Sequence, residues 1–152
     1  MALTDLLTPA AIIPALKVNS KKQALQELAS KAAELTGQNE RSILDVLAQR
    51  EKLGSTAVGN GIAIPHGKLA KIDALFGLFA RLARPVDFDA LDGQPVDLIF
   101  LLLAPEGAGA DHLKALARVA RLLREPAVAR SLRQSQDAAA LYAVLTMPPG
   151  TA

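Results

Sequence analysis

The chain has 152 residues, of which 51% are hydrophobic and 21% are charged, and its formal net charge is +2. This composition indicates a folded domain with a sizeable core instead of a disordered chain, and so small a charge does not by itself imply a polyanionic partner. Aromatic residues make up only 3%, which argues against base-stacking surfaces for nucleic acid, and the lack of cysteine excludes disulfides and thiol chemistry.

The apolar segments of the chain argue against a membrane protein. The longest apolar run, residues 98–104, is far shorter than a membrane span. The N-terminal segment carries Asp5 early and lacks the basic-then-apolar order of a signal peptide. We therefore expect a cytoplasmic protein without membrane insertion or a nucleic-acid partner. A single domain over residues 1–152 is expected, with frayed ends at about residues 1–3 and 147–152.

The first third of the chain predicts one strand and two helices. Residues 11–16 predict a short strand, whose internal proline favours an edge or bulged position. Apolar residues at helical spacing then predict a helix that follows an N-cap at Asn19 or Ser20 and ends at Gly37. A second helix is predicted from about residue 40 to residue 53 and is closed by a glycine.

The remainder of the chain predicts strands followed by helices. Residues 75–82 and 95–104 read as strands, and the second is a continuous apolar run suited to a central position covered on both faces. The connection that begins with residues 85–89 is rich in turn formers. From about residue 110 the pattern is helical, with a new helix beginning at Pro126. The order predicts an α/β fold, a mixed β-sheet flanked by helices in an α/β/α sandwich.

Residues 59–69 form the most informative motif, because they place His66 directly after a proline at the end of a short β-branched run, with glycines on both sides. The proline fixes its own φ and favours extended geometry in the residue before it. Glycines permit tight turns and the close approach of a partner's backbone or a phosphate. A structural histidine is one interpretation of this residue. The other is a nucleophile that receives and passes on a phosphoryl group.

The segment that contains this motif carries a family resemblance. Residues 50–66 resemble the phosphorylation-site signature of enzyme IIA proteins of the fructose/mannitol class, which belong to the phosphoenolpyruvate-dependent phosphotransferase system. Residues 20–25, 67–69, 88–98 and 112–113 resemble the nitrogen-regulatory branch of that class. The resemblance thus covers nearly the whole chain.

The resemblance implies a phosphohistidine carrier. His66 would accept a phosphoryl group from an HPr-type phosphocarrier protein, and its phosphorylation state would regulate target proteins of the nitrogen-related system. Two alternatives stay open: a sugar-transport enzyme IIA that passes the phosphoryl group to an enzyme IIB, and a protein-binding module that is never phosphorylated. Neither cofactor nor metal is implied. Ala57 departs from the pattern, because the family usually has glycine there. A positive φ at that position would cost alanine about 1 kcal/mol.

Two further residues are candidates for the catalytic site beside His66. His112 falls on the apolar face of the helix predicted from residue 110, as would a core histidine with a backbone partner. The resemblance instead implies that His112 lies beside His66 and hydrogen-bonds phosphoryl oxygens. Arg50 shares a helix face with Leu47 and Ile43. It could form an internal ion pair, or its guanidinium could receive phosphoryl oxygens and stabilise charge during transfer.

Other polar residues are weaker candidates. Ser55, Thr56 and Asn60 could add neutral donors around a phosphoryl group, although turns contain polar residues for other reasons. Two histidines without cysteine make a poor metal site, so no metal is expected. A basic row in the helix after residue 110 is either its solvated face or a surface for an acidic partner. The row consists of Lys114, Arg118, Arg121 and Arg124.

Overall fold

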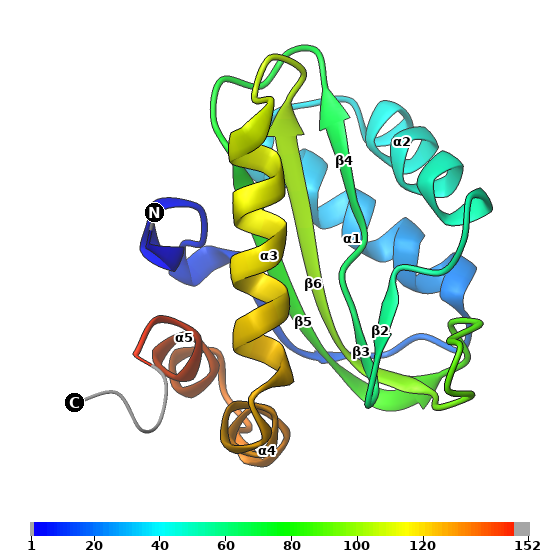
Figure 1. The fold of residues 1–152 in the computed structure, drawn as a ribbon, viewed down its shortest axis with the longest axis vertical. Coiled ribbons are helices and arrows are strands. Elements are labelled where there is room, and N and C mark those ends of the chain that lie inside the picture. Colours follow the sequence, from blue (N-terminus) through cyan, green and yellow to red (C-terminus); the bar gives the residue numbers. More distant parts are fainter. Residues whose placement is uncertain (1, 148–152) are drawn as a thin grey trace.

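The computed structural model describes residues 2–147 and contains, within them, one mixed sheet of six strands together with five α-helices (Figure 1). The predicted α/β sandwich with a single domain is confirmed. Of the ends expected to fray, Met1 and residues 148–152 lie outside the described part of the chain. Leu3 belongs to a short 3₁₀-helix, Leu3–Asp5, and is buried.

The sheet has the strand order β1-β5-β6-β3-β2, and β4 also pairs with β6. Strands β5 and β6 are antiparallel, whereas β1 runs parallel to β5, and β3 and β4 run parallel to β6. The strand bounds are β1 Ile12–Leu16, β2 Ala57–Gly59, β3 Ile62–Ala63, β4 His66–Leu69, β5 Phe76–Val86 and β6 Val96–Pro105.

Helices cover both faces of this sheet. Figure 1 shows α3 crossing in front of β5 and β6, while α1 lies behind the sheet and α2 lies beside α1 and β4. Helices α4 and α5 gather at the end of the sheet opposite the arrowhead of β4. The helix bounds are α1 Lys21–Thr36, α2 Glu40–Lys52, α3 Ala110–Arg124, α4 Pro126–Gln134 and α5 Ala138–Thr146, and a second 3₁₀-helix spans Pro9–Ala11.

The predicted helix ends are confirmed, because their capping groups make the expected contacts. The Ser20 hydroxyl accepts a hydrogen bond from the Gln23 N–H at 3.1 Å, which satisfies an unpaired donor of the first turn of α1. Gly37 ends the helix with a φ of 73°, a left-handed conformation that glycine adopts without a Cβ clash. Pro126 is the first residue of α4, where its missing N–H costs nothing.

The long strands largely follow the sequence pattern. Residues 98–104 of β6 are all buried, which confirms a central strand covered on both faces. Strand β1 lies at an edge and has a register shift between Ile13 and Leu16, as its proline predicted. The predicted connection is present over residues 87–95, but it begins two residues later than expected. Strand β5 continues to Val86 because this side chain is buried and pairs with Val96 across the sheet.

The segment around His66 contains short strands that the sequence pattern did not reveal. Strands β3 and β4 pair one after the other with the same side of β6 and are separated by Ile64 and Pro65, and β2 covers the outer side of β3. Pro65 has no N–H, but its carbonyl accepts a hydrogen bond from Leu102 N–H at 3.0 Å. His66, which follows the β-branched run, begins β4.

A tight hairpin of β2 and β3 precedes β4. Strands β2 and β3 are antiparallel, and Gly59 at the end of β2 and Asn60 and Gly61 in the turn have φ values of 98°, 58° and 80°. Ala57 is not among the non-glycine residues with positive φ in the described chain, which are Asn60 and Asp89. The alanine that departs from the family pattern is therefore unstrained.

Gly67 provides a test of how β4 packs on α2. A Cβ built at Gly67 would lie 2.1 Å from Val46 Cγ1. Because a β-branched side chain in a helix has little rotamer freedom, we expect Gly67→Ala to lower the free energy of unfolding by about 1–3 kcal/mol. Chemical denaturation measures this change. Gly107→Ala, where nothing lies within 4 Å of the added Cβ, is the matched control. Equal stability of the two variants would contradict the tight packing.

Candidate functional site

His66 lies in a hollow of 210 Å³ between α2, the segment that leads into β2, and α3. The lining side chains include Arg50 from α2 and Leu116 and Ala120 from α3. Since Gly67 faces Val46 of α2, and neighbouring residues of a strand face opposite sides, His66 faces α3. Strand β4 therefore directs the His66 imidazole into a small, partly apolar pocket.

Two hydrogen bonds fix the tautomer of His66. Its Nδ1 lies 2.8 Å from the carbonyl oxygen of Ile64, which can only accept, so Nδ1 carries the proton. Its Nε2 lies 3.3 Å from Nε of Arg50, which can only donate. Nε2 therefore holds the free lone pair. The geometry produces a neutral ring whose nucleophilic nitrogen faces a guanidinium.

Burial keeps this ring neutral. Burial is the largest cause acting on the pKa of His66 and lowers it, the hydrogen bond to Ile64 opposes this, and the charge of Arg50 lowers it further. Glu51 raises the pKa slightly, but the net direction is downward from about 6.5. At neutral pH the lone pair on Nε2 is consequently available.

Arg50 is half-buried at the C-terminal end of α2 and makes no ion pair within residues 2–147. Besides its contact with His66, its Nη1 donates to the carbonyl of Gly54 at 2.9 Å. The structure thus does not contain the internal ion pair considered from the sequence. The guanidinium has a neutral acceptor on each side, and its charge remains available to an incoming anion.

His112 lies beside His66. The two ring centroids are 5.7 Å apart with the planes at 67°, and His112 occupies the first turn of α3. It is 7% exposed, and its Nε2 is buried without a hydrogen-bond partner among the described residues. Burial lowers its pKa, and the charges of His66 and Lys68 lower it further. Buried polar atoms normally have hydrogen-bond partners. His112 is therefore not the core histidine with a satisfied ring that the sequence left open.

Of the three weaker candidates, two line the pocket and one does not. The Ser55 hydroxyl donates to the carbonyl of Phe88, and the Thr56 hydroxyl donates to the carboxylate of Glu51. Both residues line the hollow around His66, but their hydroxyl protons are already engaged. Asn60 is absent from that lining and lies in the turn between β2 and β3.

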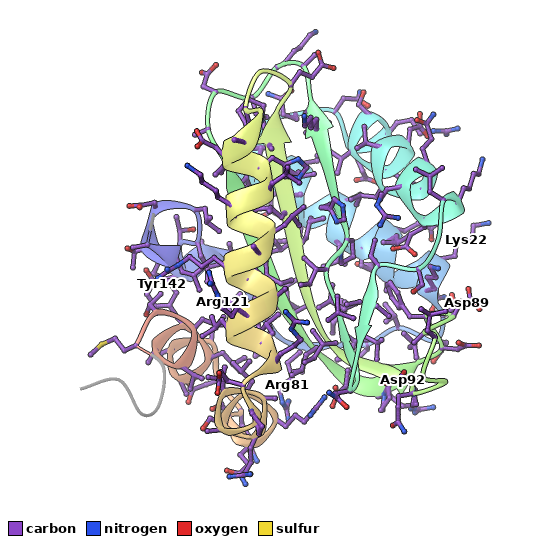
Figure 2. All side chains as sticks on the ribbon, in the orientation of Figure 1. Lys22, Arg81, Asp89, Asp92, Arg121 and Tyr142 are labelled. Carbon is purple, nitrogen blue, oxygen red and sulfur yellow. The ribbon has the colours of Figure 1, made fainter. Side chains whose placement is uncertain are left out.

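The surroundings of Asn60 confirm that it belongs to another part of the molecule. Its N–H donates to Asp92 at 2.9 Å, and its carbonyl accepts from Arg133 at 2.6 Å. Figure 2 shows Asp92 near the end of the sheet where β2 and β3 meet. Arg133 also pairs with Asp97 of β6 at 2.9 Å. Asn60 therefore serves to anchor the hairpin and gives no donor to the pocket.

Sequence reasoning missed Glu51. Its side chain is 6% exposed, forms an ion pair with Lys21 at 2.7 Å, and accepts the Thr56 N–H at 3.2 Å. The spacing along the helix could have indicated that Glu51 faces inward, because it follows Leu47 by four residues just as Arg50 follows it by three. Its partner Lys21 could not be found in this way, since it comes from another helix.

Neither a metal cluster nor a membrane helix occurs in the part of the chain that the structure describes. Within residues 2–147, no three His, Cys, Asp or Glu side chains are grouped so that they could hold a metal ion. No helix in the same range is long and apolar enough to cross a membrane.

Comparison with known proteins finds relatives and solved structures that resemble the whole chain. A nitrogen regulatory protein of Bradyrhizobium diazoefficiens is 73% identical over 152 residues, covering 100% of this chain and 99% of that protein. The crystal structure of nitrogen regulatory protein IIA-Ntr from Neisseria meningitidis has a TM-score of 0.90 at 37% identity and covers 95% of this chain and 99% of that one.

A more distant structure shares the fold. It is a complex of enzyme IIA-Mtl with phosphorylated enzyme IIB-Mtl from Escherichia coli, with a TM-score of 0.77 at 19% identity, covering 91% of this chain and 96% of that chain. Residues 5–147 match the family described as phosphoenolpyruvate-dependent sugar phosphotransferase system, EIIA 2. The resemblance of the His66 segment is thereby confirmed, and the chain belongs to this EIIA 2 family of phosphotransferase system components.

Proposed function

We propose that this chain is a phosphohistidine carrier that accepts a phosphoryl group on Nε2 of His66 from an HPr-type phosphocarrier protein. One observation carries the proposal: the Ile64 carbonyl holds the proton on Nδ1, so the lone pair on Nε2 is available in a half-buried pocket. A neutral imidazole with one fixed N–H is the form that can attack phosphorus. The proposal places the chain in the cytoplasm and uses neither cofactor nor metal.

The transfer can be written with His66 as the only nucleophile. The lone pair on Nε2 forms the new N–P bond while the bond between phosphorus and the donor's imidazole, which is protonated on its other ring nitrogen, breaks. That electron pair returns to the donor's ring nitrogen, so the donor leaves as a neutral imidazole and the positive ring charge passes to His66. The Nδ1 proton stays on His66, hydrogen-bonded to Ile64, throughout. Because one high-energy N–P bond replaces another, the step runs readily in both directions. Catalysis then consists of positioning and charge stabilisation.

Arg50 and His112 are suited to stabilise the transferred group. The 3.3 Å contact between Arg50 Nε and His66 Nε2 must open for attack, and the freed guanidinium then meets phosphoryl oxygens bonded to the same nitrogen. The buried Nε2 of His112 has no partner among residues 2–147, and as an N–H tautomer it would donate to a phosphoryl oxygen. Its place in the first turn of α3 adds the favourable field of a helix N-terminus.

Regulation by phosphorylation state is the favoured use of the phosphoryl group. The 73% identical relative is named a nitrogen regulatory protein, and the similarity covers the whole of this chain. Phosphorylation adds almost two negative charges to one face, which changes its complementarity to a partner protein. Transfer to an enzyme IIB is the second candidate, favoured by the fold shared with a IIA-Mtl that is in complex with phosphorylated IIB-Mtl. A stable phosphoryl group after addition of such a IIB would speak for regulation.

The first test is intact-protein mass spectrometry after incubation with phosphoenolpyruvate, enzyme I and an HPr-type carrier. We expect one acid-labile phosphoryl group on the wild type and none on His66→Ala, because only His66 presents a free ring nitrogen opposite Arg50. His112→Ala should be labelled at the same position but more slowly.

Two outcomes of this experiment would contradict the proposal. Equal and complete labelling of both histidine variants would move the acceptor elsewhere. A wild type that stays unlabelled, while the same donor labels another acceptor, would favour the binding module that is never phosphorylated.

Arg50→Gln tests the guanidinium. The variant keeps a polar side chain but loses the charge that stabilises developing negative charge, and removing one such donor costs about 10²–10³-fold in rate elsewhere. We expect a loss of that order in the initial rate of His66 phosphorylation, measured by rapid quench. Arg84→Gln, at an exposed position of β5, is the control and should match the wild type. Similar rates for both variants would exclude a direct role for Arg50.

The pH dependence follows from the lowered pKa values. Burial lowers the pKa of both His66 and His112 in the folded state. Just below a pH of about 6.5, the unfolded chain therefore binds more protons than the folded chain. The free energy of unfolding should therefore fall as the pH drops from there to the folded pKa values, and level off below them as far as these groups are concerned. NMR titration of the ring protons should give both midpoints below that of free histidine. Midpoints at or above it would contradict the burial argument.

A further inference from the structure

A row of hydrogen bonds connects the buried carboxylate of Glu51 to the imidazole of His66. Glu51 accepts the Thr56 N–H at 3.2 Å and also the Thr56 hydroxyl. The Thr56 carbonyl accepts the Ile64 N–H at 3.0 Å. The Ile64 carbonyl then accepts the Nδ1–H of His66 at 2.8 Å. Each hydrogen bond in this row thus fixes the position of the next residue, from Glu51 to His66.

The carboxylate at the start of the row is itself immobilised. Its side chain is 6% exposed, and Lys21 Nζ of α1 lies 2.7 Å from Oε2. Lys21 also lies 3.5 Å from Asp89 and 5.3 Å from the centre of the Phe88 ring. Figure 2 shows Asp89 on the same edge of the molecule as Lys22, where α1 begins. A buried charge that is paired and hydrogen-bonded has little freedom to move.

Ile64 depends on its hydrogen bond to Thr56 because it lies between β3 and β4, outside the paired residues of both strands. The pairing of β3 with β6 ends at Ala63, and the pairing of β4 begins at His66. The N–H of Ile64 is directed instead to Thr56, across the end of the hairpin. If Thr56 shifts, the carbonyl that holds the Nδ1 proton loses its position as well.

We propose that Glu51 is a positioning residue for His66, which acts through Thr56 and Ile64 to hold the proton on Nδ1 and leave Nε2 free. The inference rests on the proposed function for its catalytic meaning, but the tautomer can be measured without any phosphoryl donor. It also gives Thr56 a role: its hydroxyl orients the loop through Glu51 and is not a donor to the phosphoryl group. Lys21 acts one step further out, by fixing the carboxylate.

The direct test is the tautomer of His66 in the unphosphorylated protein, read from long-range ¹⁵N–¹H NMR spectra of the ring. We expect the wild type to show the Nδ1–H form alone. Glu51→Gln and Thr56→Val should show a mixture with the Nε2–H form, because each weakens the contact that holds Thr56. Thr56→Ser keeps the hydroxyl and should restore the wild-type spectrum. Glu34→Gln, an exposed carboxylate of α1, is the control.

The second readout is the initial rate of His66 phosphorylation by an HPr-type donor. A proton on Nε2 removes the nucleophile, and small misplacements of reacting groups are costly, so we expect Glu51→Gln and Thr56→Val to be slower by about tenfold or more. Thr56→Ser and Glu34→Gln should keep the wild-type rate. Thermal denaturation of each variant separates this effect from a loss of folding.

The outcomes distinguish this inference from the proposed function. A wild-type tautomer in folded Glu51→Gln and Thr56→Val overturns the positioning role, whatever the rates. A mixed tautomer with an unchanged rate overturns it too. If the wild type accepts no phosphoryl group, the proposed function fails, while the spectra still decide whether Glu51 holds the ring. Should Glu51→Gln leave Lys21 with Asp89 as its single ion-pair partner among the described residues and fail to fold, Lys21→Met/Glu51→Gln and Thr56→Val decide the question.

Discussion

The hydrogen bond from Nδ1 of His66 to the Ile64 carbonyl is the contact on which the chemistry of this site depends. Ile64 directs its N–H to Thr56, on the side away from β6, whereas the carbonyl of Pro65 accepts from Leu102 of β6. Backbone groups of neighbouring strand residues alternate in this way, so the Ile64 carbonyl is not used by β6 and accepts from the ring instead. The backbone at Ile64 therefore decides which ring nitrogen of His66 carries the proton.

The electrostatics of the pocket follow from partial burial. A fully exposed imidazole would be largely unperturbed, and a fully buried one could not meet a partner protein. At the observed depth the pKa of His66 is lowered, so the ring is neutral, while the guanidinium of Arg50 stays charged beside it. Arg50 makes no ion pair within residues 2–147, so in the proposed function its charge is available to an incoming phosphoryl group. The Nε2 of His112 has no partner among the same residues and is the second place where the proposal has this group stabilised.

The fold brings these residues together from four separate elements. The buried strand β6 provides the edge on which β4 lies, and α2 and α3 bring Arg50 and His112 from opposite faces of the sheet. Lys21 of α1 reaches the same region through Glu51. The ring is held by two hydrogen bonds and lies in the small hollow, which suits the proposed exchange of a phosphoryl group with other proteins.

The sequence by itself determined the strongly periodic elements and the family, and it singled out His66 as the candidate acceptor. Caps at Ser20 and Gly37 and the apolar run of β6 are local signals, and the segment around His66 is long enough to place the chain in its family. Only the tertiary structure revealed β2, β3 and β4, because strands of two to four residues are stabilised by their neighbours and not by their own pattern. For the same reason, it alone separated Asn60 from the pocket and joined Glu51 to Lys21: such contacts connect residues that are distant in sequence, and no spacing rule encodes them.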